Sequence, residues 1–189
     1  MVESMPYADL DVSVRREIAI LQDRAYRPPD PLPDQLAPLH DPALQAQSFL
    51  LRSDGQLVSY AGVVTTTIHT NGMAFTASGL SCVATDPDFA RRGFASEVVA
   101  ATSRYIGRSG VDLGVFTCAP ELVRLYAEAG DWHVEPDVTL IGSRDPNALT
   151  STALGVVVLM RLFSQRALAN ADSLRRATID LGLPVGQFW

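Results

Sequence analysis

Apolar residues recur every three to four positions in three segments of the chain, at residues 10–26, 94–108 and 120–130. This spacing gathers them on one face of a helix and leaves the charged residues on the other faces. Pro120 suits the first turn of the third helix, and Gly130 is expected to end it. The pattern predicts three amphipathic helices, and residues 173–181 are expected to be helical or irregular.

Runs of β-branched and apolar residues predict strands between these helices. The first three strands are expected at residues 48–52, 57–69 and 73–85, with a tight hairpin at Asn71-Gly72. Residues 111–118 are continuously apolar, as in a strand whose two faces are both covered. Two further strands are expected at residues 132–142 and 153–163.

The order of these elements predicts a single mixed α/β domain over residues 1–189. Its sheet begins as an antiparallel meander and continues as strand, helix, strand and helix. Residues 27–42 carry six prolines and three aspartates, so we expect a loop there. A loop of this length inside a compact domain is often functional.

Charge and composition narrow the function. The net charge is −6, which argues against nucleic-acid partners and suits a cationic substrate. Every basic residue is arginine, and the absence of lysine excludes a phosphate-loop lysine or a Schiff base. No basic stretch precedes an apolar run at the start of the chain, and no apolar run is long enough for a membrane span. We therefore expect a cytoplasmic protein with no membrane partner.

The two cysteines, Cys82 and Cys118, lie in apolar runs and are expected to be buried free thiols. A covalent mechanism on either thiol is disfavoured because no paired histidine is evident. No spacing of zinc ligands is present, so we expect no metal.

The segment from Val83 to Ser96 carries the strongest chemical signal. A strand runs into Asp86-Pro87, a basic glycine-containing loop follows, and a helix then begins. The N–H groups of such a loop and the positive end of the helix dipole form an anion site. Arg91 and Arg92 beside it suit phosphate, so a phosphorylated cofactor is expected.

This segment resembles the pyrophosphate loop of the GNAT superfamily of N-acetyltransferases, which use acetyl-coenzyme A. Gly93 and Ala95 match the loop pattern, and Ala90 stands where the family has arginine or glutamine. Residues 125–130, Leu-Tyr-Ala-Glu-Ala-Gly, resemble a second family signature, with Asp131 inserted before the aromatic residue. The final Gly-Gln-Phe-Trp resembles the aminoglycoside 2'-N-acetyltransferase branch, with Gln187 where that branch tends to have an acid.

The resemblance implies a central, mostly antiparallel sheet with a splayed parallel strand pair and helices on both faces. It implies acetyl-CoA as cofactor, with pantetheine paired to the main chain of residues 80–85. The implied cofactor-binding residues are Val83, Ala84, Thr85, Arg91, Arg92, Gly93, Phe94, Ala95 and Ser96.

The resemblance also implies roles in the chemistry. Tyr126 would protonate the departing thiolate, although its helix face also suits plain core packing. The identity of the general base that deprotonates the amine is left open. The carboxylate of Trp189 is the first candidate, followed by Asp180, His69 and His133. An amine that arrives already deprotonated would need no base. Ser81, Cys82 and Asp180 are expected near the substrate.

The expected function is acetyl transfer to a small cationic amine, aminoglycoside-like or a polyamine. A coenzyme A-binding protein without turnover is the alternative from another class, because Gly79-Leu80-Ser81-Cys82 holds no carboxylate. A longer acyl group and a peptide amine also stay open, as does a homodimer.

Overall fold

The computed structural model describes residues 1–26, 38–183 and 188–189. They divide into two compact units, Met1–Val64 with Leu80–Ser103, and Thr65–Gly79 with Arg104–Trp189. Strands β3 (Gln56–Thr70) and β4 (Met73–Thr85) and helix α2 (Phe94–Arg108) contribute residues to both units. The fold is mixed α/β, as predicted, with a sheet that is mostly antiparallel and includes a parallel pair.

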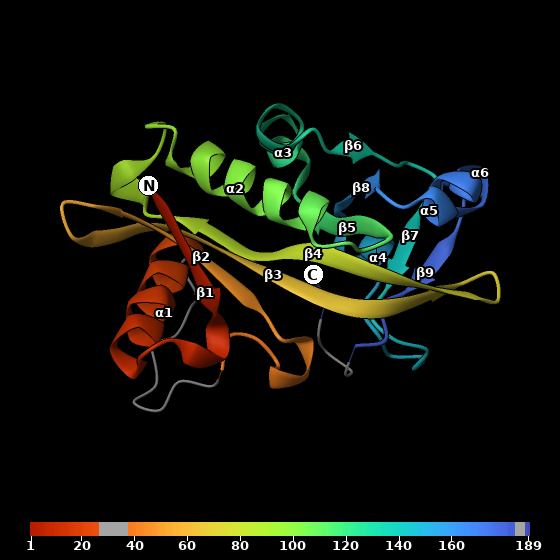
Figure 1. The fold of residues 1–189 in the computed structure, drawn as a ribbon, viewed down its shortest axis with the longest axis horizontal. Coiled ribbons are helices and arrows are strands. Elements are labelled where there is room, and N and C mark those ends of the chain that lie inside the picture. Colours follow the sequence, from red (N-terminus) through yellow and green to blue (C-terminus); the bar gives the residue numbers. More distant parts are fainter. Residues whose placement is uncertain (27–37, 184–187) are drawn as a thin grey trace. The chain divides into compact units, whose positions relative to one another are not determined.

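The first unit is an antiparallel sheet with a helix on each face. Strand β1 (Val2–Pro6) pairs with β2 (Gln47–Ser53), and β2 pairs with β3. Figure 1 shows helix α1 (Val12–Tyr26) and the start of α2 on opposite faces of these strands. Helix α1 turns Ile18 and Leu21 inward, in keeping with its apolar spacing.

The second unit contains the parallel pair. Strand β5 (Leu113–Cys118) lies parallel to β4 and antiparallel to β8 (Val157–Leu162), which also pairs with β6 (His133–Val134). Strand β9 (Thr178–Asp180) is parallel to β7 (Thr139–Ile141) and antiparallel to β3. The helices are α3 (Val123–Gly130), α4 (Ser151–Leu154), α5 (Gln165–Ala169) and α6 (Ala171–Leu174), and the short 3-10 helices of both units are η1 (Tyr7–Asp9), η2 (Pro42–Leu44), η3 (Pro87–Phe89) and η4 (Pro120–Leu122).

Three sequence expectations for the second unit were wrong. Residues 132–142, expected to form one strand, form two short ones, and residues 178–180, expected to be helical or irregular, form strand β9. Residues 151–154, partly assigned to a strand, form helix α4, because Thr150 accepts a hydrogen bond from Ala153 N and Gly155 ends the turn at φ 65°. The capping hydrogen bond thus favours a helical turn over the strand that was expected to begin in this segment.

The end of α3 also differs from the expectation. Gly130 is the last helical residue, and Asp131 takes the left-handed conformation at φ 57° that was expected of the glycine. Aspartate tolerates this region better than most residues. No helix among the described residues is long and apolar enough to cross a membrane.

Candidate functional site

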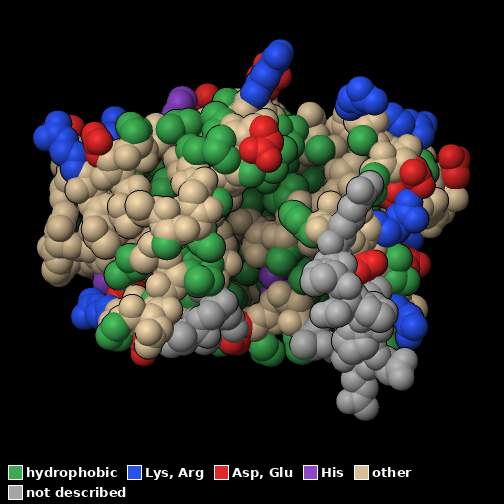
Figure 2. Space-filling model, turned by 180° about the vertical axis from the view of Figure 1, so that it is seen from behind, with side chains coloured by type: hydrophobic (Ala, Val, Ile, Leu, Met, Phe, Trp, Pro, Cys, Tyr) green, Lys and Arg blue, Asp and Glu red, His purple; other side chains and the backbone are tan. Residues whose placement is uncertain are grey.

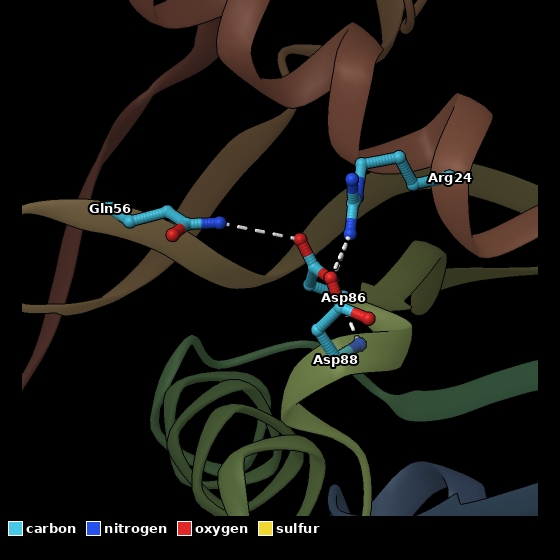
Figure 3. Close-up of polar contacts among 4 residues, drawn as sticks. All are labelled: Arg24, Gln56, Asp86 and Asp88. Atoms are coloured by element: carbon cyan, nitrogen blue, oxygen red, sulfur yellow. Dashed lines mark hydrogen bonds and ion pairs between the residues drawn. The ribbon is translucent and has the colours of Figure 1, made fainter.

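A buried carboxylate anchors the segment that joins β4 to α2. Asp86 is 1% exposed and accepts a hydrogen bond from Asp88 N, which caps the 3-10 helix η3. Arg24 of α1 donates to Asp86 at 2.9 Å and to Asp88 at 2.6 Å, and Gln56 of β3 donates to Asp86 at 3.4 Å (Figure 3). The start of the loop is therefore tied to both α1 and β3.

The loop itself leads a series of main-chain N–H groups into the start of α2. Arg91 and Gly93 have positive φ angles, 61° and 87°, and the first helical bond runs from Glu97 N to Gly93 O. The N–H groups that precede this bond have no intrahelical acceptor. A main chain that alternates handedness in this way forms an anion-binding concavity.

The space beside Gly93 fits a phosphate. A Cβ built on Gly93 would meet no atom within 4 Å. Arg92 lies over the rings of Phe89 and Phe94, with its guanidinium carbon 5.1 Å and 5.5 Å from their centroids. These aromatic contacts hold a cation beside the loop although position 90 is alanine. The residues present therefore fit a diphosphate.

Strand β4 is irregular next to this loop. Cys82 has a left-handed main chain at φ 53°, a conformation that interrupts the regular pleat as a β-bulge does. Its carbonyl accepts from Gln22, the Val83 carbonyl accepts from Tyr26, and the Ala84 carbonyl accepts from Ser59. Side chains of the first unit thus engage three successive carbonyls of the segment expected to pair with pantetheine.

The cysteine thiols are not poised as nucleophiles. Burial raises the pKa of Cys82, and Ser81 Oγ lies 3.4 Å from its sulfur. Burial, with a smaller contribution from Glu121, raises the pKa of Cys118 to about 11. Both thiols therefore stay protonated at neutral pH.

In the second unit, Tyr126 lies on the inner face of α3. It is 4% exposed, and its ring meets Phe116 edge to face at 5.0 Å between centroids. Phe116 also packs against Trp132 at 4.7 Å. Tyr126 is thus rigidly packed in an aromatic cluster, which suits a positioned proton donor and a core residue alike.

Trp189 occupies the place where the pairing of β4 with β5 ends. This pairing joins Ala77 to Leu113 and Ser78 to Gly114. The next carbonyl of β5, that of Val115, accepts from the Trp189 indole at 3.0 Å. Thr117 donates to the main-chain oxygen of Trp189 at 3.0 Å. The indole therefore substitutes for a ladder hydrogen bond between the two strands.

Two of the other candidate bases, Asp180 and His133, have partners of their own. Asp180 is 8% exposed, accepts from Arg144 Nε at 2.8 Å and from Gly182 N at 2.9 Å, and pairs in register with His69. His69, Arg144 and Asp180 line a cavity of about 350 Å³ beside the β3–β4 hairpin. His133 is exposed and lies 3.8 Å from Asp131. The structure brings Asp180 and His69 together and places His133 apart from them.

Sequence reasoning missed His40, in the first unit. It is 4% exposed, its Nε2 lies 2.8 Å from the Tyr60 hydroxyl, and that hydroxyl lies 3.1 Å from Ser48 Oγ. Burial lowers the pKa of His40 to about 4, so the imidazole is neutral at pH 7. Its place in the proline-rich loop, between Pro38 and Pro42, was the available signal; residues 27–37 of that loop lie outside the described residues.

Charged side chains of both signs are interspersed on the face of the molecule drawn in Figure 2. A nucleic-acid-binding surface needs basic side chains gathered in a patch or a stripe. On the face in view, acidic side chains lie beside basic ones, and the net charge of the chain is −6.

Comparison with known proteins gives a consistent result. A family model described as an acetyltransferase (GNAT) domain matches residues 10–134. A GNAT family N-acetyltransferase from Escherichia coli, solved in complex with CoA, is 14% identical with a TM-score of 0.58, covering 97% of this chain and 87% of that one. A GNAT family acetyltransferase from Brucella melitensis, solved with acetyl-CoA, is 13% identical with a TM-score of 0.55, covering 87% and 89%.

The length of the similar proteins varies. A probable N-acyltransferase from Enterococcus faecalis is 18% identical with a TM-score of 0.52, covering 66% of this chain. The chain spans only 31% of that protein and 30% of a second long one, from Mycobacterium abscessus. A search of curated proteins found no match to this sequence.

Proposed function

This chain belongs to the GNAT acetyltransferase family, and on that premise we propose that it transfers acetyl from acetyl-CoA to a small amine that is cationic at neutral pH, aminoglycoside-like or a polyamine. The observation that carries the proposal is the loop from Arg91 to Ser96. Its main-chain amides at the start of α2, its open space beside Gly93 and its stacked Arg92 suit a diphosphate.

Holding the cofactor is assigned to the first unit. The amides of the loop would bind the pyrophosphate, and Arg92 would add a cation close to it. The amides of Val83, Ala84 and Thr85 on β4 would pair with the pantetheine arm. Acetyl-CoA supplies the thioester whose acetyl group is transferred.

The chemistry requires a neutral amine and a proton for the leaving thiolate. The amine nitrogen forms a bond to the thioester carbonyl carbon, and the carbon–sulfur bond breaks. Tyr126 is proposed to give its phenolic proton to the thiolate, since a tyrosine pKa of about 10 and a thiol pKa of about 8.5 lie close together. The main-chain carboxylate of Trp189 is proposed to take the proton of the amine.

The proposal of a cationic acceptor rests on the net charge of the chain. The net charge of −6 favours encounter with a cation. We place Ser81 and Cys82 near the acceptor because they form the irregular part of β4. Asp180, whose carboxylate accepts a hydrogen bond from Arg144, is also proposed as a contact of the acceptor. A cytoplasmic location, one functional domain over residues 1–189 and a homodimer complete the proposal.

A thiol-release assay with an amine panel tests the function. Wild-type protein is expected to release coenzyme A from acetyl-CoA only when an acceptor amine is present. The absence of lysine makes the product easy to identify by mass spectrometry, because no lysine of the chain competes as acceptor. Gly93→Asp places a carboxylate against the phosphates and should abolish cofactor binding; intact binding would contradict the assigned loop.

The second candidate is a protein that binds acyl-CoA without turnover. It is favoured by residues 79–82, which hold no carboxylate, and by the ion pair that occupies Asp180. Acetyl-CoA binding with no thiol release for any amine would support it. Acyl-CoA donors of increasing chain length test the longer-acyl alternative. A peptide with a free amino terminus, added to the amine panel, tests the peptide alternative.

A further inference from the structure

Strand β4 carries one residue more than β3, its neighbour in the sheet. Asp86 N donates to the Val58 carbonyl at 2.9 Å, yet Asp86 lies one position farther from the Asn71-Gly72 turn than Val58 does. In an uninterrupted antiparallel hairpin, bonded residues lie equally far from the turn, so the extra residue is a β-bulge. Cys82, at φ 53°, is the one residue of β4 with a positive φ, which locates the bulge there.

The bulge determines which main-chain groups of β4 face away from β3. The N–H of Asp86 faces β3, and the Ala84 carbonyl accepts from a side chain of β3 at 3.0 Å. Successive residues of a strand direct their main-chain groups to opposite sides, so Val83 and Thr85 face away from β3. A shift of one residue would reverse this alternation and turn both amides into the sheet. The amides proposed to meet pantetheine are therefore accessible only while the bulge is kept.

Helix α1 contacts the bulge directly. The Cys82 carbonyl accepts from Gln22 Nε2 at 2.6 Å, and Tyr26, one helical turn further along, donates to the Val83 carbonyl at 2.5 Å. A left-handed main chain is unfavourable for cysteine, which has a Cβ and no polar side chain to compensate. Such a conformation persists only where surrounding contacts hold it. Gln22 supplies the contact to the left-handed residue itself.

We propose that Gln22 is a positioning residue of the acetyl-CoA site. Its hydrogen bond to the Cys82 carbonyl keeps the bulge, and the bulge keeps the amides of Val83 and Thr85 directed towards the pantetheine arm. Gln22 acts through β4 and touches neither the cofactor nor the acceptor. The inference rests on the cofactor site of the proposed function and adds to it a residue of α1.

Calorimetry with coenzyme A measures this role without any transfer. Gln22→Met keeps the length of the side chain and the helix propensity but removes the donor. Coenzyme A should bind this variant about tenfold more weakly than wild type. The KM for acetyl-CoA should rise by a similar factor with kcat nearly unchanged, because Gln22 does not contact the reacting atoms. Gln22→Glu, which has no side-chain donor at neutral pH, should behave in the same way.

A double-mutant cycle tests whether Gln22 acts through the bulge. Glycine adopts a positive φ without the penalty of a Cβ, so Cys82→Gly frees the bulge from its dependence on Gln22. In that background, Gln22→Met should weaken coenzyme A binding by about twofold or less. Gln165→Met makes the same exchange at an exposed position of α5 and should bind coenzyme A like wild type. Thermal unfolding shows that each variant is folded at the temperature of the titration.

The outcomes separate this role from acetyl transfer. Wild-type affinity of Gln22→Met and Gln22→Glu for coenzyme A, or a tenfold loss that persists in the Cys82→Gly background, would overturn the role of Gln22. The expected pattern of binding with no thiol release from acetyl-CoA keeps that role and rejects transfer. Thiol release by wild type with unchanged binding by both Gln22 variants keeps transfer and rejects the role. A wild-type protein that does not bind coenzyme A would overturn both.

Discussion

At the scale of single residues, the sequence predicts only those features that have a local pattern. The amides of the loop at Gly93 were identifiable because glycine spacing before a helix is a local pattern. His40 was not, because its importance depends on burial and on the Tyr60 hydroxyl, which is distant in sequence. The left-handed conformation of Cys82 also left no signal, since cysteine has no preference for it.

His40 predicts a specific pH dependence of stability. Burial lowers the pKa of His40 from 6.5 to about 4. Between these two pH values the imidazole is protonated in the unfolded chain but stays neutral in the folded protein. Above pH ~6.5 His40 is neutral in both states, so the free energy of unfolding is not reduced by it. As the pH falls towards 4, the free energy of unfolding decreases by about 3 kcal/mol. Urea unfolding at pH 7, 5.5 and 4 measures it.

The comparison for this prediction is His40→Gln, which should lose less stability than wild type over the same pH interval. His133→Gln, at an exposed position, should retain the wild-type dependence. Identical curves for wild type and His40→Gln would show that another group is responsible.

Tyr126→Phe tests the proposed proton donor. The change keeps the ring that packs on Phe116, so the free energy of unfolding should change little. Loss of a general acid reduces turnover by roughly 100-fold or more. Steady-state kinetics should show this fall in kcat with an unchanged KM for acetyl-CoA, and unchanged turnover would remove Tyr126 from the mechanism.

At the scale of elements, strong local patterns gave the correct bounds. Helix α2 and strand β4 begin and end where the sequence predicted, because apolar spacing, Asn71-Gly72 and the Asp86-Pro87 turn all agree. Strand β1 was missed because residues 2–6 are mostly exposed, show no regular alternation of apolar and polar residues, and are ordered by pairing with β2. Strand β9 was missed for a similar reason, since three residues carry no reliable periodicity.

The connection between β4 and α2 depends on Asp86. Asp86→Ala removes the cap of η3 and leaves Gln56 without its acceptor, so we expect a loss of about 2 kcal/mol in unfolding free energy and weaker binding of acetyl-CoA. Asp88→Ala is the matched control, because Asp88 shares Arg24 as partner but is exposed. Chemical unfolding of both variants should show a clear loss only for Asp86→Ala.

The junction of β4 with β5 has no room for a side chain. A Cβ on Gly79 would lie 2.6 Å from both the Trp189 indole nitrogen and the Val115 carbonyl. Gly79→Ala should therefore destabilise the protein by about 1–3 kcal/mol.

A second glycine supplies the control. Gly107 lies in α2, and its added Cβ would make only ordinary contact at 3.7 Å with Phe163. Gly107→Ala should stabilise by about 0.5–1 kcal/mol through helix propensity. Thermal unfolding that ranks the two variants in the opposite order would contradict this picture of the junction.

At the scale of the whole molecule, the fold class followed from the order of elements and the family from a few motifs. The family model covers residues 10–134 and so includes the loop at Gly93 and Tyr126. Asp180 and Trp189 lie beyond that match. The cofactor residues could therefore be argued from the resemblance, whereas no local motif marks the acceptor side.

The position of Trp189 also provides an intrinsic optical probe. The chain has two tryptophans, so Trp132→Phe leaves a single tryptophan, whose indole N–H is bound to the carbonyl of Val115. A buried indole emits at shorter wavelength than one in water. Any molecule that displaces the indole from β5 will therefore shift the emission to the red, and its arrival can be timed by stopped flow without a label.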